Sequence, residues 1–324
     1  LRACAFRSGM SHPEAQDVGA VMLAIEHRLM HAETLAYLLH QLRPREKGPG
    51  PLPLPSHDCA PRRWVEVPAG TVQLGIEPGH RGFAWDNEYG AHDVRVPAFA
   101  IDSRNVTNGD FRSFVEAGGY GDPSLWSVED WAWRKSTFLE HPSYWVQRGG
   151  RWWYRAMFGQ VPLGEAWPVY VSHAEAAAYA RWRGCRLPTE AEYQRAAYTT
   201  PDGRKRSFPW GETRPAPRHG AFGFGGWDPT PVGSHPAGDT SAGVSDLVGN
   251  GWEWTSTPFA PFPGFQPLAA YAGYSADFFD GRHYVLKGAS PRTPHSLVRR
   301  SFRNWFQPRY PFPYATFRCV EPRG

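Results

Sequence analysis

Two histidines four residues apart, His27 and His31, have the residue type and spacing that most directly indicate chemistry in this sequence. On an α-helix the two positions differ by about 40° around the axis, so their side chains stand one above the other on one face. Two stacked imidazoles can share a divalent metal ion, and the alternative is a pair of polar residues on a solvated helix face. Glu33 turns by about 200° from His31 to the other side of the helix, so we expect that it is not a ligand of the same ion.

The histidines lie within a long helical pattern. Residues 11–14, Ser-His-Pro-Glu, have the form of a helix start with Ser11 as the N-cap, and apolar residues recur with helical period from Val18 to Leu42. A single amphipathic helix cannot bury its own apolar face. We therefore expect it to belong to a bundle whose other helices lie upstream of this sequence, and the start at Leu1, without a methionine, agrees with that interpretation.

The composition limits the class of protein. Aromatic residues make up 15% of the 324 residues, with 15 Trp, 34 Gly and 32 Pro, which indicates a loop-rich globular fold held by aromatic clusters. The net charge of +4 is spread without a long run of one sign, so we expect small-molecule partners and no nucleic acid. Four scattered cysteines, no membrane-spanning apolar run and no signal peptide predict a cytoplasmic protein without a membrane partner.

A Pro/Gly-rich segment divides the chain. Residues 47–61 contain five prolines, a composition that excludes a helix and is typical of a semi-rigid linker between residues 1–46 and 62–324. Short strands are predicted at 64–68, 72–75, 93–96 and 99–102. Three later helices are predicted from capping boxes that begin at Thr107, Ser172 and Thr189, and the remainder reads as turns and short strands.

Residues 62–324 carry five ordered motifs that resemble the signatures of the formylglycine-generating-enzyme (sulfatase-modifying factor) fold. They are residues 184–193 (Gly-Cys-Arg-Leu-Pro-Thr-Glu-Ala-Glu-Tyr), 208–211 (Phe-Pro-Trp-Gly), 246–255 (Asp-Leu-Val-Gly-Asn-Gly-Trp-Glu-Trp-Thr), 287–290 (Lys-Gly-Ala-Ser) and 315–318 (Ala-Thr-Phe-Arg). The resemblance implies an α+β, C-type-lectin-like domain with modest secondary structure. Formylglycine-generating enzymes share a pair of cysteines near the C-terminus, whereas here Cys319 has no neighbour back to Gly288, so that activity is not expected and Cys319 reads as a buried core residue.

A second family fits the whole chain better. The pattern His27-x-x-x-His31-x-Glu33 before such a domain resembles the sulfoxide synthases of ergothioneine and ovothiol biosynthesis, in which a DinB-like helical bundle precedes the lectin-like domain. Further matches are residues 85–88 (Trp-Asp-Asn-Glu), 125–127 (Leu-Trp-Ser), 274–279 (Tyr-Ser-x-x-Phe-Phe) and 302–305 (Phe-Arg-Asn-Trp). The resemblance implies a non-haem Fe(II) held by three histidines. His12 is about 22 Å from His27 along the helix, so we expect the third histidine upstream of this chain.

The resemblance also implies the substrates and their contacts. Hercynine, a thiol and O2 would meet at the iron, forming a carbon–sulfur bond at imidazole C2 and a sulfoxide. Asn304 and Trp305 lie in the segment that lines the hercynine site, where an aromatic face suits a trimethylammonium group. Arg309 is a candidate partner for the thiol substrate's carboxylate, and Tyr271 and Tyr274 are candidate proton donors. The alternatives are a core tryptophan, a surface arginine and structural tyrosines.

Phe306 bears on the choice of thiol. Members that use γ-glutamylcysteine resemble one another in an aspartate directly after Asn-Trp, and this chain has phenylalanine there, so we expect cysteine to be preferred. Residues 250–253, Asn-Gly-Trp-Glu, occupy a loop that in related folds can hold a structural Ca2+ through Glu253 and backbone carbonyls, and the alternative is a Trp-anchored turn without metal. Two other functions stay open: an ovothiol-type synthase acting on histidine, and a non-catalytic lectin-like binding module.

Overall fold

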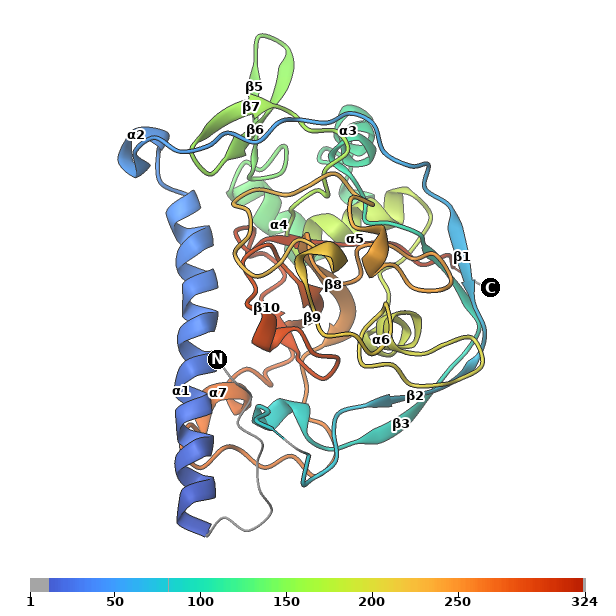
Figure 1. The fold of residues 1–324 in the computed structure, drawn as a ribbon. Coiled ribbons are helices and arrows are strands. Elements are labelled where there is room, and N and C mark those ends of the chain that lie inside the picture. The colour runs from blue at the N-terminus through green and yellow to red at the C-terminus, as the bar shows by residue number, and fades with distance from the viewer. Residues whose placement is uncertain (1–11, 81, 323–324) are drawn as a thin grey trace.

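Helix α1 (His12–His40) runs along one side of the rest of the chain (Figure 1). The structure, a computed structural model, describes residues 12–80 and 82–322, with side chains from residue 19 onward. The predicted N-cap Ser11 lies outside the described residues. A short turn of helix, α2 (Pro44–Lys47), follows α1, and the extended linker then crosses the top of the molecule in Figure 1 before it enters the domain.

The domain is α+β with short elements, as the sequence predicted. Its strands are β1 (Trp64–Val67), β2 (Gly70–Leu74), β3 (His92–Val96), β4 (Phe99–Asp102), β5 (Trp145–Arg148), β6 (Arg151–Ala156), β7 (Gly159–Pro162), β8 (Gly251–Pro258), β9 (Tyr284–Ala289), β10 (Asn304–Phe306) and β11 (Ala315–Thr316). Its helices of four or more residues are α3 (Asn108–Glu116), α4 (Val128–Ser136), α5 (His173–Trp182), α6 (Glu190–Tyr198) and α7 (Gly273–Ala276).

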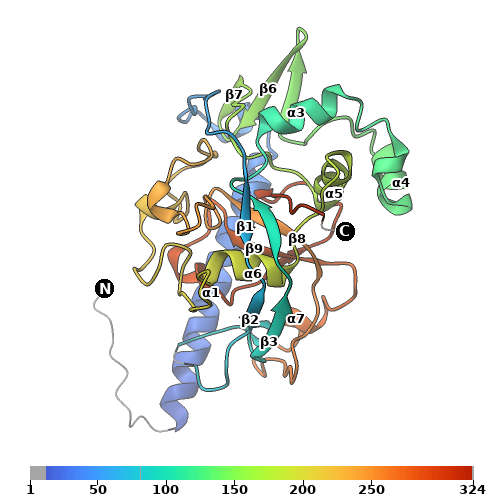
Figure 2. The same cartoon turned by 90° about the vertical axis from the view of Figure 1, so that its right-hand side faces the viewer.

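The strands of the described residues form small separate sheets. β1 pairs with β4 and β2 with β3, while β5, β6 and β7 make a three-stranded antiparallel sheet. The largest sheet has the order β10-β9-β8-β11, in which β11 is parallel to β8 and the other pairs are antiparallel. In this order β10 is an edge strand, with β9 as its neighbour. The side of the domain away from α1 is formed by β1 and by α6 beside the β2–β3 pair (Figure 2).

The three predicted capping boxes are confirmed. Thr107, Ser172 and Thr189 each accept a hydrogen bond from the backbone N–H three residues later, and they begin α3, α5 and α6. The side chains of Asp110, Glu175 and Glu192 reach back to the N-cap backbone in each case. Helix starts of this kind depend on local residues alone, which is why they could be found from the sequence.

Strand β8 occupies the centre of the domain and is buried over Trp252, Glu253 and Trp254. The Glu253 carboxylate accepts hydrogen bonds from Arg318 Nε and Nη2, each at 2.7 Å, and from Asn105 Nδ2 at 3.0 Å. The Asn250 carbonyl accepts a hydrogen bond from the Tyr170 hydroxyl. These contacts occupy the oxygens considered for Ca2+, so the geometry favours the alternative of a Trp-anchored turn, and a Ca2+ site there stays an unsupported prediction.

Helix α1 contacts the domain through three buried polar residues at seven-residue intervals, Glu26, Glu33 and His40, here called the docking seam. Seven residues correspond to nearly two helical turns, so all three lie along one stripe of the helix. Both carboxylates of the docking seam accept the indole N–H of a buried tryptophan: Trp85 donates to Glu26 at 2.9 Å and Trp252 to Glu33 at 2.7 Å. Burial raises the pKa of both glutamates.

His40 forms the upper end of the docking seam. Its Nε2 lies 2.8 Å from the Arg155 carbonyl, which can only accept, so Nε2 carries the proton and Nδ1 faces the Tyr314 hydroxyl at 3.0 Å. Both nitrogens of the neutral ring are thus satisfied. Burial lowers the pKa of His40 to about 3. A proton added to this ring would have to displace the Tyr314 contact in a buried site.

The opposite stripe of α1 is apolar and exposed. Its exposed side chains are Val21, Ile25, Leu35, Leu38 and Leu39. The long helix predicted from the sequence is therefore present, and the bundle expected to cover this stripe stays a prediction. Over the described part of the chain, no helix has both the length and the apolar character needed to cross a membrane.

A first prediction concerns His40. Because the pKa of His40 is about 3 in the folded protein and the usual value is 6.5, its contribution to stability is present near neutral pH and is lost as the pH falls from 6.5 toward 3. Between pH 7 and pH 5 the stability advantage of the wild type over His40→Gln should shrink by about 2 kcal/mol. Denaturant unfolding at the two pH values measures this difference. Replacement of the exposed His57 by Gln is the control, and an advantage over His40→Gln that did not change with pH would contradict the account.

Candidate functional site

His27 and His31 face the same space beside α1, as their spacing predicts. Their Nε2 atoms are 3.2 Å apart and their ring centroids 4.5 Å apart. Two imidazole nitrogens that bind one metal ion at right angles, each about 2.1 Å from it, would lie about 3 Å apart. Burial lowers the pKa of His27, and the charges of His31 and Arg28 add to the effect, which favours the neutral ring that metal binding requires.

The pair offers two ligands of one ion and the described residues offer no third. Within residues 12–80 and 82–322 there is no group of three or more His, Cys, Asp or Glu side chains placed to hold a metal ion. Glu33 belongs to the docking seam, where its carboxylate is bonded to Trp252, Ser290 and Thr293, so it does not point toward the histidines. The side chain of His12 lies outside the described ones, and a third histidine upstream stays a prediction.

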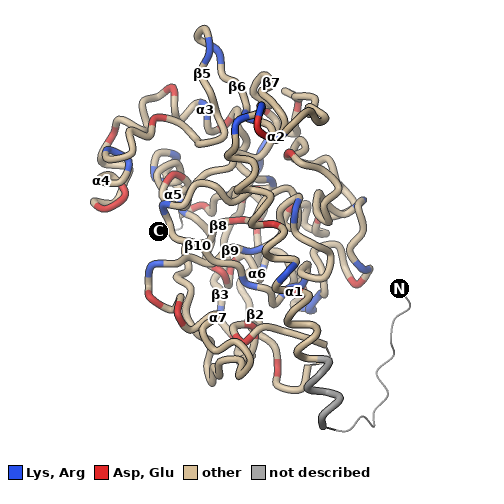
Figure 3. Tube along the Cα trace, turned by 90° about the vertical axis from the view of Figure 1, so that its left-hand side faces the viewer, with Lys and Arg blue, Asp and Glu red and all other residues tan. Residues whose placement is uncertain are grey.

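The histidine pair opens onto a cavity of about 400 Å³ between α1 and the domain. The lining comes from α1, from the segment around α7 and from β10 with the turn after it. The lining residues are His27, Met30, His31, Thr34, Tyr37, Tyr271, Tyr274, Phe278, His283, Asn304, Trp305, Phe306, Gln307 and Tyr310. On the side of the molecule that α1 covers, basic and acidic residues are interspersed without a patch of one sign (Figure 3).

The two candidate tyrosines differ in setting. The Tyr271 ring is 5.4 Å from the His27 ring in an edge-to-face arrangement, and 40% of the residue is exposed. Tyr274 is 8% exposed, stacks on Trp85 at 3.8 Å and donates its hydroxyl to the Met30 sulfur at 3.3 Å. Burial raises the pKa of Tyr274 well above its usual value. Tyr271 is thus the phenol beside the histidine pair, and Tyr274 is the packed one.

Asn304 and Trp305 both line the cavity from β10. Trp305 pairs with Val285 of β9 in register, and its ring stacks on Phe259 at 4.2 Å. Its edge contacts Tyr274 at 5.2 Å, which leaves part of the ring toward the cavity. The Asn304 side-chain carbonyl accepts the Trp305 backbone N–H at 2.9 Å. The aromatic surface predicted for a trimethylammonium group therefore lies in the same cavity as the histidines.

Phe306 lies at the cavity, whereas Arg309 does not. Phe306 lines the cavity and stacks on Tyr310 at 5.7 Å, with Tyr37 at 6.2 Å. Arg309 is not a lining residue: its Nε donates to Asp130 of α4 at 2.8 Å. The role predicted for Arg309 at the thiol carboxylate therefore has no geometric support here and stays a prediction.

Several lining residues were missed from the sequence. Met30, Thr34 and Tyr37 follow His27 by three, seven and ten residues, so continuing the helix face of the histidine pair would have found them. His283 and Gln307 carry no such signal, because each lies in the cavity only through the pairing of β9 with β10. Sequence spacing can extend a helix face but cannot show which strands become neighbours.

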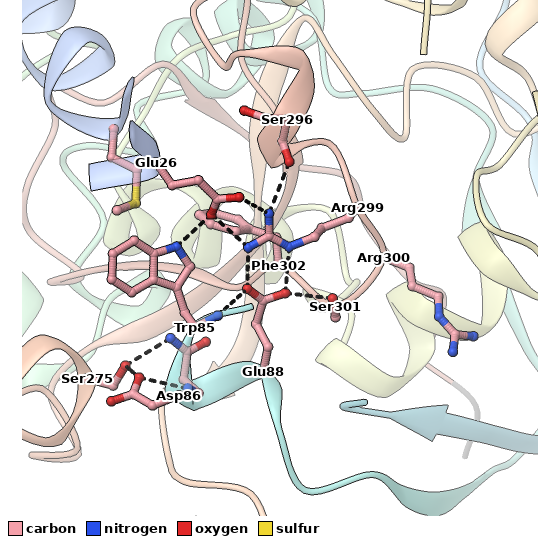
Figure 4. A network of polar contacts seen from close by, with 12 residues as sticks. Glu26, Trp85, Asp86, Glu88, Ser275, Ser296, Arg299, Arg300, Ser301 and Phe302 are labelled. Atoms are coloured by element: carbon pink, nitrogen blue, oxygen red, sulfur yellow. Dashed lines mark hydrogen bonds and ion pairs between the residues drawn. The ribbon is translucent and has the colours of Figure 1, made fainter. Parts of the chain in front are cut away.

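A polar network holds α1 next to the cavity (Figure 4). Arg299 donates to Glu26 at 2.8 Å and to Glu88 at 2.8 Å, so one guanidinium joins a carboxylate of the docking seam to a carboxylate of the domain. Burial alone would raise the pKa of Glu88, but the charge and hydrogen bonds of Arg299 outweigh it and lower that pKa. The position of the histidine pair therefore depends on a buried ion pair at Glu26, the residue directly before His27.

Both the sequence and the fold are similar to those of known proteins. Residues 53–323 match the family model of the sulfatase-modifying factor enzyme 1-like domain. A hercynine oxygenase of Mycolicibacterium thermoresistibile is 39% identical over 91% of this chain and 67% of its own length. Ergothioneine biosynthesis protein 1 of Neurospora crassa is 28% identical over 93% of this chain and 43% of its own length.

Among solved structures, PvdO from Pseudomonas aeruginosa superposes with a TM-score of 0.53 at 22% sequence identity, over 79% of this chain and 93% of its own. At that identity the likeness shows the fold alone. The match to the hercynine oxygenase has a higher sequence identity, 39%, and its coverage of 91% of the chain reaches beyond residues 53–323 matched by the family model. The chain therefore carries a sulfatase-modifying factor enzyme 1-like domain and belongs, as an enzyme, to the hercynine oxygenase family.

Proposed function

We propose that this protein is a non-haem Fe(II)-dependent sulfoxide synthase that joins a thiol to C2 of hercynine with O2, in ergothioneine biosynthesis. The observation that carries the proposal is the pair of imidazole nitrogens, 3.2 Å apart, at one end of a cavity of about 400 Å³. The choice of hercynine as substrate rests on the name of the hercynine oxygenase that is 39% identical to this chain. The cavity volume suits two small substrates held together.

The reaction balances without an external reductant. Hercynine loses the hydrogen at C2, the thiol loses its own, and a carbon–sulfur bond forms. One oxygen atom becomes the sulfoxide oxygen and the other leaves as water, so the two substrates together supply the four electrons that O2 takes up. The protein's part is to orient both substrates and to supply protons.

His27 and His31 are the residues that would hold the iron, and their spacing fits adjacent positions of one ion. When bound, the iron supplies activation of O2 together with open positions for the substrates. The helix contributes rigidity, because the docking seam fixes its rotation and therefore the direction of both rings. Neither Nε2 has a partner besides the other among the described residues, so both are free to bind a metal ion.

Hercynine and the proton donor are assigned by position. Trp305 presents an aromatic face to the cavity, which suits the trimethylammonium group of hercynine, with Asn304 beside it. Tyr271 is the phenol whose ring contacts His27, so it is the better placed of the two tyrosines to donate a proton at the reacting oxygen. Tyr274 acts through packing, since its hydroxyl is bonded to the Met30 sulfur.

Cysteine is the preferred thiol in this proposal. None of the residues that line the cavity is an aspartate or a glutamate, and the position after Trp305 is Phe306, stacked on Tyr310. An ammonium group buried against phenylalanine would be left without an acceptor, at a cost of roughly several kcal/mol. Cysteine is smaller than γ-glutamylcysteine and has no second amino-acid head group to place there.

The iron ligands are tested by His27→Ala and His31→Ala. Each substitution removes one of two adjacent ligands, so iron retention after anaerobic reconstitution and sulfoxide formation should both be abolished. Metal analysis and mass spectrometry of the products measure the two effects, with His57→Ala as the control on an exposed histidine. Full iron content and full activity in either variant would rule out the metal site.

Glu33 provides a contrasting test. Glu33→Gln alters the docking seam and not the histidine face, so iron binding should stay largely intact. Glu33→Ala leaves Trp252, Ser290 and Thr293 without their acceptor and should lower the free energy of unfolding by about 2 kcal/mol or more. Metal analysis and denaturant unfolding measure the two outcomes. Loss of iron from a stably folded Glu33→Gln protein would mean that Glu33 acts at the metal.

The thiol preference is tested at Phe306. Phe306→Asp introduces an acceptor for an ammonium group, so the ratio of kcat/KM should move toward γ-glutamylcysteine by about tenfold or more. Phe306→Asn introduces a side chain of the same shape as aspartate but without its charge, so it should change the ratio of kcat/KM less. Both thiols at equal concentration, with the products separated by mass, give the ratio directly. Predominant use of γ-glutamylcysteine by the wild type would refute the preference and leave the iron site untouched.

A further inference from the structure

The cavity contains few groups that can carry a positive charge. None of its lining residues is lysine, arginine, aspartate or glutamate, and its ionisable side chains are three histidines and four tyrosines. Two of the histidines, His27 and His31, are the proposed metal ligands. Hercynine and cysteine each bring a carboxylate into this space. The third histidine, His283, is therefore the one lining group besides the metal pair that can take a positive charge.

His283 is held in place from two directions. Its Nδ1 lies 2.9 Å from Asp280 Oδ1, which also accepts the backbone N–H of Arg282 at 2.8 Å. Its backbone carbonyl accepts the Phe259 N–H at 2.7 Å. The turn that makes this possible contains Gly281 with φ of +70°, a conformation that favours glycine. Nε2 has no partner among the described residues and is the nitrogen left for a ligand.

His283 and Trp305 lie on the same side of the sheet. Trp305 pairs with Val285, and His283, which directly precedes β9, is two residues before Val285, so in an extended chain the side chains of His283 and Val285 point to the same face. The Phe278 ring contacts both, with centroids 5.2 Å from His283 and 5.6 Å from Trp305. His283 thus stands next to the surface proposed for the trimethylammonium group.

We propose that His283 binds the carboxylate of hercynine through Nε2–H, with Asp280 as the positioning residue that holds Nδ1. The inference rests on the proposed function, since it assigns a contact to the hercynine of that reaction. In hercynine the carboxylate and the trimethylammonium group are attached to the same carbon, so a group that binds one must lie within a few ångströms of the group that binds the other. The doubly protonated imidazole has one N–H for Asp280 and one for the substrate.

The test is anaerobic calorimetric titration of the Fe(II)-loaded protein with hercynine and with N,N,N-trimethylhistamine, which lacks only the carboxylate. Without O2 and thiol no turnover interferes. The wild type should bind hercynine at least about tenfold more tightly than the analogue. In His283→Phe hercynine should weaken to the level of the analogue, whose own affinity should not change. His283→Gln, which keeps an N–H donor, should retain part of the preference for hercynine over the analogue. The control His57→Phe should bind both ligands as the wild type does.

The outcomes separate the two proposals. Retention of the full preference for hercynine over the analogue in both His283 variants would overturn the carboxylate contact and leave the proposed function intact. Equal weakening of both ligands would show a structural role and would also overturn it. Failure of the wild type to bind hercynine would refute the proposed function and, together with it, the contact between His283 and the hercynine carboxylate. For Asp280→Ala, a smaller loss confined to hercynine is expected, and unchanged affinity would remove its positioning role.

Discussion

Burial of polar groups on one stripe of α1 is the constraint on which the site depends. Glu26, Glu33 and His40 are removed from water, and each must meet a matching group of the domain or lose about 1–3 kcal/mol. A slip of the helix by one residue would turn it by about 100° and separate all three from their partners at once. The docking seam therefore permits one rotation of the helix, and that rotation directs His27 and His31 into the cavity.

The docking seam also explains two tryptophans of the sequence motifs. Trp85 and Trp252 donate their indole N–H groups to Glu26 and Glu33, and each is buried. A tryptophan combines a large apolar body with one donor, so it can fill the interface and satisfy a carboxylate with the same side chain. The α1 helix and the lectin-like domain are thus joined by specific polar pairs, while the cavity between them is lined mostly by aromatic rings.

Features that depend on residues close together in the chain could be predicted from the sequence. The helix caps at Thr107, Ser172 and Thr189, the position of His27 and His31 on one helix face and the turn of Glu33 away from them all follow from spacing along the chain. Helix α4 and the β5–β7 sheet were missed, since aromatic residues in short segments have no distinctive period. The sequence also could not show that Asp130 pairs with Arg309, or that β9 brings His283 to Trp305, because both depend on contacts between distant segments.

The docking seam has a consequence for the order in which the molecule assembles. The last partners of Glu33 and His40 to be synthesised are Thr293 and Tyr314, which lie 260 and 274 residues further along the chain. During translation α1 therefore leaves the ribosome on the order of tens of seconds before these groups exist. Over that interval the carboxylates of Glu26 and Glu33 stay in contact with water, and the apolar stripe of α1 is accessible to chaperones. The histidine pair is synthesised early, but it acquires its fixed orientation only when the last strands have been made.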